Sequence, residues 1–406
     1  MKVVFNKLRD ISLSITDGVH NTIIDDVNGD SFLLSAKNIK NGLVNFDNTD
    51  RRINNEVREK LNKRTKMSYG DVLLTTVGTL GETALADEKY NEYEFQRSVA
   101  IIKPNKDIIN NKYLYYLLKS NSYNYYFKSI ATGAAQPCIF IGNLGKTKIE
   151  YFDDINYQKR IADILSAYDD LISKNNCRIK VLEKIAQELY KEWFVRFRFP
   201  GHETTKFENG LPVGWERKKV STYYNTCSGG TPSRTHEEYF DTGIYPWVKT
   251  GEIKDCIIID TEEYITEEAV KKSSAKLLPA KLVAMAMYGV NIGQLGYFDS
   301  QMTCNQACCV FSDKRNFSSK HYLFQYLKSI REYLLLISFG AAQQNLSQDL
   351  IKKIKIVMPS EEVVRAFEER IDVIYDSIKM LMQKNKNLSK QRDLLLPRLM
   401  SGKLEV

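Results

Sequence analysis

The first long run of regular hydrophobic spacing lies between Asp154 and Val195, a stretch without glycine or proline. Its apolar side chains recur at alternating steps of three and four residues, which is the seam of a heptad repeat. A helix of this length would extend about 60 Å, at roughly 1.5 Å per residue. Asn175 is a polar member of the seam, where it costs stability but can fix the register of a helix pair.

A second run of the same spacing lies between Ser360 and Pro397, where the proline is expected to interrupt the helix. A long helix with one apolar stripe needs a partner in water, so the two helices are predicted to pair with each other. Alternatively, each helix packs on a globular domain of its own, although a compact domain offers little surface for so long a helix. The predicted seam comprises Ile161, Leu165, Tyr168, Ile172, Asn175, Leu182, Leu189, Ile371, Ile378, Asn385, Leu388 and Leu395.

The rest of the chain carries short apolar runs, such as 71–77, 97–104 and 281–288, separated by Gly, Asn and Asp turn signals. Helical stretches are predicted at 112–119 and 321–328. This mixture predicts compact α/β or α+β domains with many loops.

Several segments recur half a chain apart. Lys249 in WVKTGEI follows Lys37 in SAKNI by 212 residues, whereas HYLFQYLKS at 321–329 follows KYLYYLLKS at 112–120 by 209. The offset falls along the chain, as small loop deletions in a duplicated domain would make it. The repeat is large enough for a core of its own, so we interpret it as a tandem domain duplication. The predicted parts are globular domains at 1–153 and 201–358 and long helices at 154–200 and 359–406.

Composition and charge narrow the class of protein. The 406 residues include 58 Lys and Arg against 50 Asp and Glu, a net charge of +8. This mild basic excess permits nucleic-acid binding without establishing it. No apolar run approaches the roughly 18 residues of a membrane helix, and the N-terminus lacks a signal-peptide pattern. A cytoplasmic protein that does not bind membranes is therefore expected.

Catalytic and metal-binding motifs are sparse. The seven cysteines and four histidines have no zinc-finger spacing, so no metal site is expected. Gly145-Lys146-Thr147 resembles the end of a phosphate-binding loop, but that loop requires glycine at position 140, which is Phe140. The chain is therefore predicted to perform no covalent chemistry.

Small clusters of polar residues and glycine occur at corresponding places in both halves of the chain. Glycine lets a backbone approach closely, and polar side chains supply hydrogen bonds, which is what reading base edges and phosphates requires. Each cluster alone also suits a turn with capping residues, but recurrence in two halves favours binding. The pairs are 16–22 with 227–235, 35–38 with 248–251, 75–81 with 287–293, 95–97 with 305–307, and GAAQ at 133–136 with GAAQQ at 340–344.

Over essentially its whole length the chain resembles the specificity subunit of Type I restriction–modification systems. The combination of duplicated halves, two long helices and the repeated GAAQ carries this resemblance more than any single motif. The segments that carry it are DGVHNT (17–22), GGTPSR (229–234), WVKTGEI (247–253), GVNIG (289–293), Asn305-Gln306, KIAQELYKEWFVRF (184–197), LPVGW (211–215) and RDLLLPRLMSGKL (392–404).

The resemblance implies an α/β (α+β) tandem duplication, with two globular target-recognition domains joined by two long antiparallel coiled-coil helices. Each domain would read one part of a split target in double-stranded DNA, and the helix pair would set the gap. Two DNA adenine methyltransferase subunits are implied as partners, with translocase–endonuclease subunits in a system that restricts. S-adenosylmethionine, and ATP with Mg in a restriction complex, would be bound by those partners and no cofactor by this chain.

The base-contacting residues of this family vary, so we take as candidates the polar members of the matched loops. Because these loops differ between the halves, we predict an asymmetric target. The candidate DNA-binding residues are Thr16, His20, Asn21, Lys37, Asn38, Arg97, Gln136, Thr231, Ser233, Lys249, Thr250, Asn291, Gln306 and Gln343.

Two other functions stay open at this point. An enzyme with an unrecognised active site, such as a nuclease, would show metal-dependent activity by itself. A coiled-coil scaffold would not bind duplex DNA even at low salt. The residues also leave open whether the system restricts DNA or only methylates it.

Overall fold

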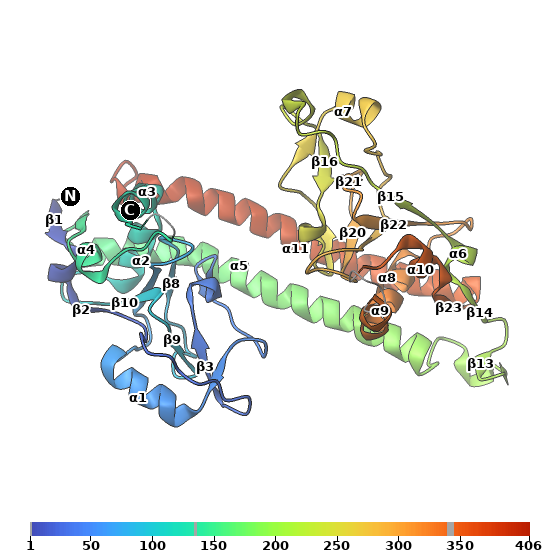
Figure 1. The fold of residues 1–406 in the computed structure, drawn as a ribbon, viewed down its shortest axis with the longest axis horizontal. Helices are drawn as coiled ribbons and strands as arrows, with labels where there is room; N and C mark the ends of the chain where they lie inside the picture. Colours follow the sequence, from blue (N-terminus) through green and yellow to red (C-terminus); the bar gives the residue numbers. More distant parts are fainter. Residues whose placement is uncertain (1, 134–135, 339–344) are drawn as a thin grey trace. The chain divides into compact units, whose positions relative to one another are not determined.

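The computed structural model describes residues 2–133, 136–338 and 345–406, which form two compact units (Figure 1). Unit 1 comprises the chain up to Ser173 together with Lys386–Val406. Unit 2 is Lys174–Asn385. Each unit therefore contains one globular domain and a segment of each of the two long helices.

Unit 1 is built on a four-stranded sheet of order β2-β10-β7-β8 and a three-stranded sheet of order β6-β3-β9. Its main strands are β2 (Ser12–Asp17), β3 (Ser31–Leu34), β6 (Arg52–Ile53), β7 (Val72–Thr75), β8 (Thr83–Leu85), β9 (Tyr93–Phe95) and β10 (Val99–Pro104). Two short pairs are added, β1 (Val3–Lys7) with β11 (Lys148–Phe152) and β4 (Ile39–Lys40) with β5 (Leu43–Val44). Its short helices are α1 (Asn55–Thr65), α2 (Asn111–Lys119), α3 (Asn121–Ile130) and α4 (Ile141–Gly145).

Unit 2 has a five-stranded sheet of order β15-β22-β19-β20-β17 and a three-stranded sheet of order β18-β16-β21. The strands are β15 (Tyr224–Ser228), β16 (Tyr245–Val248), β17 (Cys256–Ile258), β18 (Tyr264–Ile265), β19 (Val283–Ala286), β20 (Leu295–Phe298), β21 (Thr303–Cys304) and β22 (Cys308–Asp313). The short pairs are β12 (Phe207–Glu208) with β13 (Leu211–Pro212) and β14 (Glu216–Lys219) with β23 (Lys355–Met358). The short helices are α6 (Val220–Tyr223), α7 (Glu267–Lys272), α8 (Lys320–Ser329), α9 (Arg331–Ser338) and α10 (Gln348–Lys353).

The two units repeat one topology, which confirms the predicted duplication. The order β2-β10-β7-β8 returns as β15-β22-β19-β20, and β6-β3-β9 returns as β18-β16-β21. In both three-stranded sheets, the central strand pairs in parallel with the third and antiparallel with the first.

The backbone corrects one detail of the predicted alignment. Leu34 pairs with Phe95 as Val248 pairs with Cys304, so Ser35 is the counterpart of Lys249. The amides of these two residues also donate to equivalent side chains, Ser35 to Asn38 at 3.0 Å and Lys249 to Glu252 at 2.8 Å. Sequence comparison had matched Lys249 with Lys37, two positions further on, because both are lysines in a polar cluster.

The two long helices are α5 (Ile155–Tyr190) and α11 (Glu361–Met400), of 36 and 40 residues. In unit 2 the ring of Trp193, in the π-turn that follows α5, lies 5.7 Å from that of Phe367, whereas Asn175 bonds to Asn385 at 2.8 Å. Residues later in α5 therefore contact residues earlier in α11, so the two helices are antiparallel. All the predicted seam residues are buried or half-buried.

The C-terminal helix differs from the prediction at its end. It continues through Pro397 to Met400. Leu396 and Leu399, on either side of the proline, are buried in the core of unit 1. Burial of two leucine side chains is worth several kcal/mol, roughly as much as the cost of about 3 kcal/mol for a helical proline.

A buried polar side chain ties each long helix to its globular domain. In unit 1 Gln158 accepts the amide of Asn110 at 2.7 Å, and its own amide donates to the Phe152 carbonyl at 2.7 Å. In unit 2 the buried Glu368 of α11 accepts the amides of His321 and Tyr322, each at 2.9 Å. Burial raises the pKa of Glu368 to about 7.

Glu368→Gln is expected to remove a pH-dependent loss of stability from unit 2. Since the folded pKa lies above the ordinary 4.5, stability from this carboxyl is present at low pH and declines as pH rises from about 4.5 to about 7. The variant should gain up to about 3 kcal/mol relative to the parent between pH 5 and pH 8. Thermal unfolding of both proteins across this range checks it. The charged neighbours His321, Lys320 and Asp372 are present in both proteins.

The exposed neighbour Glu369 provides the control, because Glu369→Gln makes the same chemical change outside the core. A Glu368→Gln difference that stays constant from pH 5 to pH 8 would contradict the expected result.

Candidate nucleic-acid interface

In unit 1 the loop after β2 is held against the turn after β9. A Cβ on Gly18 would overlap the carbonyl oxygens of Phe95 and Gln96, so only glycine allows this approach. The Val19 amide donates to the Phe95 carbonyl at 2.7 Å, and the Arg97 amide donates to the Val19 carbonyl at 3.0 Å. These contacts bring His20 and Asn21 into the same surface as Arg97.

Three further loops join this surface through Ser98 and Thr76. The Ala36 amide donates to the Ser98 hydroxyl at 3.0 Å, and the Thr76 amide donates to the Ser98 carbonyl at 2.8 Å. The Ile139 amide donates to the Thr76 carbonyl at 2.9 Å. We call this surface the rim of unit 1, comprising residues 18–21, 35–38, 76–81, 96–98 and 136–139.

Unit 2 assembles the equivalent loops in the same way. The Gly230 amide donates to the Cys304 carbonyl at 2.9 Å, and the Asn305 amide donates to the Val248 carbonyl at 3.0 Å. The hydroxyl of Thr231 bonds to the side chain of Gln306. Residues 345–346 join these loops, because the Leu346 amide donates to the Met287 carbonyl at 3.0 Å. The rim of unit 2 comprises residues 229–235, 248–252, 287–293, 305–307 and 345–346.

Most of the candidate residues lie in these rims, with different exposure. Thr16, in β2, is half-buried, as are Lys249 and Thr250. The candidate Gln343 lies outside the described residues. The exposed candidates are His20, Asn21, Lys37, Arg97, Gln136, Thr231, Ser233 and Gln306.

Asn38 and Asn291 are buried, with 4% and 8% of their surface exposed. The amide of Asn38 donates to the Asn45 carbonyl at 2.9 Å and to Asp50 at 3.0 Å. The amide of Asn291 donates to the carbonyls of Thr250 and Gly251 at 3.0 and 3.2 Å. In this conformation both side chains hold the loops of the rim in place and do not face outward as a direct contact with bases would require.

The lysines of the rims are already paired with acids. Lys37 lies 2.8 Å from Asp50. Lys249 lies 3.0 Å from Glu263 and 3.1 Å from Glu262, and hydrogen bonds to these carboxylates raise its pKa. In contrast, the exposed Arg97 guanidinium forms no ion pair within the described part of the chain. Arg97 is therefore available to an external anion without breaking an internal contact.

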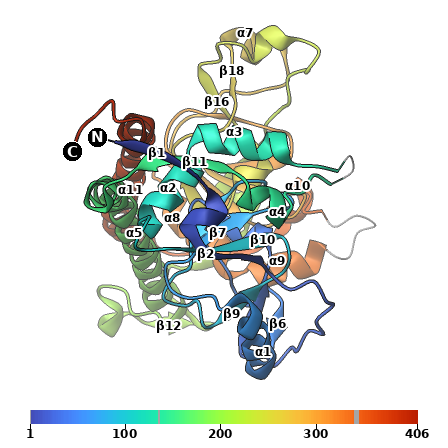
Figure 2. The same ribbon diagram turned by 90° about the vertical axis from the view of Figure 1, so that its left-hand side faces the viewer.

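Sequence reasoning missed a basic surface on α1, next to the rim of unit 1. Figure 2 shows α1 beside β6 and β9. Its exposed cations are Lys60, Lys63 and Arg64, with Lys66 at the C-cap. Arg64 donates to the Asp17 and Gly18 carbonyls at 2.6 and 2.5 Å, which fixes it to the loop after β2. The run Lys63-Arg64-Thr65-Lys66 was a signal for this surface.

A cavity of about 350 Å³ lies between α1 and this loop, lined by His20, Asn21, Lys60 and Arg64 above a buried carboxylate, Glu94. The Thr65 hydroxyl donates to Glu94 at 3.1 Å. Burial raises the pKa of Glu94 to about 7. The cavity therefore combines exposed cations and hydrogen-bonding side chains with one buried carboxyl group.

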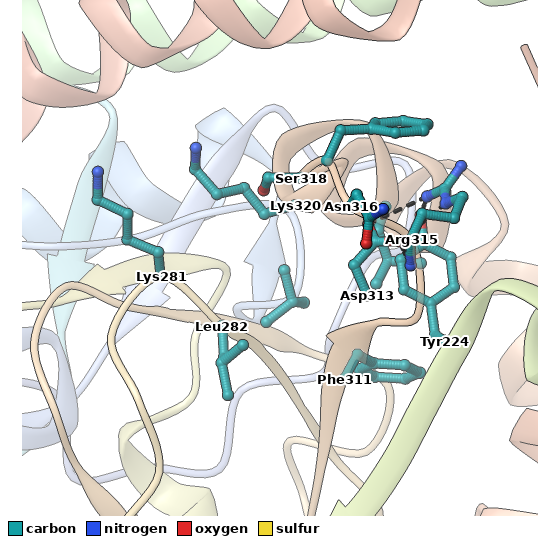
Figure 3. Close-up of a pocket in the computed structure, with 12 residues that line it drawn as sticks. Tyr224, Lys281, Leu282, Phe311, Asp313, Arg315, Asn316, Ser318 and Lys320 are labelled. Atoms are coloured by element: carbon teal, nitrogen blue, oxygen red, sulfur yellow. Dashed lines mark hydrogen bonds and ion pairs between the residues drawn. The ribbon is translucent and has the colours of Figure 1, made fainter. Parts of the chain in front are cut away.

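A second cavity, of about 340 Å³ in unit 2, is also basic (Figure 3). Two of its three cations are already neutralised: Arg315 bonds to Asp313 at 2.8 Å, and Lys320 lies 2.8 Å from Asp372. Lys281, at the edge of the cavity, is exposed. None of the residues that line this cavity belongs to the rim of unit 2, so it adds nothing to that surface.

The described residues also lack two other features. They contain no group of three or more His, Cys, Asp or Glu side chains placed to hold a metal ion. Within the same residues, every helix is too short or too polar to cross a membrane.

Both halves of the chain are similar to known proteins of one kind. The family model for the Type I restriction modification DNA specificity domain matches residues 22–184 and 212–390, once in each half. The Type I restriction enzyme MjaIX specificity subunit of Methanocaldococcus jannaschii is 27% identical over 345 residues, covering 83% of this chain and 78% of that protein. The HindI specificity subunit of Haemophilus influenzae is 24% identical over 400 residues, with 82% and 86% covered. The crystal structure of an S subunit from M. genitalium shares the fold, with a TM-score of 0.59 and 16% identity over 98% of this chain and 96% of that one.

Proposed function

Because this chain belongs to the family of Type I restriction modification DNA specificity domains, we propose that its two rims read the two parts of a split, asymmetric DNA target. The observation that carries the proposal is the convergence of five loops into one surface in each copy of a duplicated fold. Exposed Asn, Gln, Thr, Ser and Arg side chains on closely packed loops supply the hydrogen bonds that base edges and phosphates accept or donate.

The asymmetry follows from the residues that differ between the rims. Gln306 of unit 2 is close in position to Arg97 of unit 1, because each residue follows the third strand of its three-stranded sheet. Arginine makes its commonest specific contact with guanine, whereas glutamine pairs with adenine. The basic surface of α1 also has no equal in α7, where Lys271 and Lys272 pair with glutamates within the helix.

The long helices are proposed to set the distance between the half-sites. They are continuous, and each contributes to both units. The bond between Asn175 and Asn385 would fix their register, since a slip would leave two amides without a partner in the seam.

The partners that we propose are double-stranded DNA and two DNA adenine methyltransferase subunits, with translocase–endonuclease subunits in a system that restricts. S-adenosylmethionine, and ATP with Mg²⁺, would be bound by those subunits. This chain would contribute recognition and assembly and no catalytic group.

The test is to express the chain with the methyltransferase subunit encoded beside it and to map methylated adenines across the genome. The expected result is a split, asymmetric motif with a fixed gap. Replacing the globular domain of one unit with that of a relative should change one half of the motif and leave the other half and the gap unchanged. A stable complex without any new methylation, or a change in both halves after one replacement, would contradict the proposal.

A further inference from the structure

The turn that joins β19 and β20 carries an apolar side chain at its tip. Val290 is 98% exposed, the largest exposed fraction among the large apolar residues of the described chain. It lies in the rim of unit 2, whose other exposed side chains, Tyr288 of the same turn among them, carry hydrogen-bonding groups.

Glycines and hydrogen bonds shape the turn that presents Val290. Gly289 and Gly293 adopt positive φ angles of 79° and 76°, and the Gly293 amide donates to the Ala286 carbonyl at 2.9 Å. The buried Asn291 side chain bonds to the Thr250 and Gly251 carbonyls, which attaches the turn to a neighbouring loop of the rim. The exposure of Val290 is therefore imposed by its backbone.

Single exposed apolar residues are common on proteins, but the repeat supplies a comparison. In unit 1 the β7–β8 turn also has two glycines at positive φ, Gly78 and Gly81 at 81° and 82°, but two residues lie between them, whereas three lie between Gly289 and Gly293. Its exposed tip residue is Thr79. The exposed residues of that shorter turn, Gly78 and Thr79, are not large apolar residues, so the apolar tip belongs to unit 2 alone.

We propose that Val290 contacts the C5-methyl group of a thymine in the major groove of the half-site read by unit 2, and that it is a specificity-determining residue. The inference rests on the proposed function. The thymine methyl is the apolar group that distinguishes A·T from the other base pairs in the major groove. A rigid valine on a surface of hydrogen-bonding side chains is complementary to that group.

The experiment measures binding of the complex of this chain with its methyltransferase subunits to duplexes that carry its mapped target. Each thymine of the unit 2 half-site is replaced in turn by deoxyuridine, which lacks only the methyl. One position should weaken binding about fourfold, the effect of one buried methyl-sized group. Val290→Ala should weaken binding to the parent duplex by a similar factor and abolish the response to deoxyuridine at that position.

Val213→Ala is the matched control, because Val213 is an exposed valine of unit 2 that lies outside the rim. It should behave like the parent protein. The inference is overturned if no deoxyuridine weakens binding more than twofold, or if Val290→Ala keeps the full response. The inference is also overturned if Val290→Ala weakens binding while no deoxyuridine substitution has an effect. That result would indicate that the Val290 side chain inserts between bases. A complex without any sequence preference would instead contradict the proposed function itself.

Discussion

Gly229→Ala is expected to disrupt the rim of unit 2. The new Cβ would overlap the carbonyl oxygen of Cys304 and lie 2.6 Å from its Sγ. Both belong to β21, whose Cys304 is fully buried, so neither can move freely. The loop must therefore leave the strand and lose the bond from the Gly230 amide to the Cys304 carbonyl. We expect a cost of about 3 kcal/mol or more, at the upper end for overpacking.

Hydrogen exchange of the full chain would measure this effect. Amides of the loop 229–235 and of β21 should exchange faster in Gly229→Ala, while those of unit 1 should not change. Gly251→Ala is the control, because no atom lies within 4 Å of a Cβ at that position of the same rim. Equal behaviour of the two variants would show that the approach at Gly229 is not obligatory.

Gln158→Glu is expected to destabilise unit 1 by about 3 kcal/mol at pH 8, because it buries a charge without an opposite charge to pair with it. The Gln158 side chain is fully buried and donates to the carbonyls of Phe152 and Ile108, at 2.7 and 3.2 Å. A carboxylate there would face two oxygens in place of donating to them. Its protonated form still donates one bond, so the loss should be smaller at pH 5 than at pH 8.

Thermal unfolding at the two pH values, with hydrogen exchange to locate the effect, would measure the loss. The amides of β11 and α2 in unit 1 should lose protection, and those of α8 in unit 2 should keep it. Asn156→Asp is the control, since it makes the same amide-to-acid change at an exposed position on the same turn of helix. A pH-independent loss would contradict the argument.

The amphipathic helices and the duplication could be predicted because both are local or additive properties of the sequence. Steps of three and four residues repeat along 155–190 whatever surrounds them, and matched segments preserve their order through any number of loop changes. The repeat also singled out the polar clusters of each half, whereas their convergence into one surface became evident only from the bonds between loops in the fold.

The direction of each polar side chain was decided only by tertiary structure. Asn38 and Asn291 have the composition of contact residues, yet each is turned inward by carbonyl groups from a loop elsewhere in the sequence. Conversely, α1 joins the rim of unit 1 because Arg64 reaches the loop after β2, 46 residues away.

The sequence by itself thus determined the two long helices, the repeated domain and the set of loops from which a binding surface is made. Which residues of those loops face outward, Val290 among them, was determined by the fold. The physical reason is that helical periodicity depends on neighbours three or four positions apart, whereas exposure depends on packing and hydrogen bonds between segments distant along the chain.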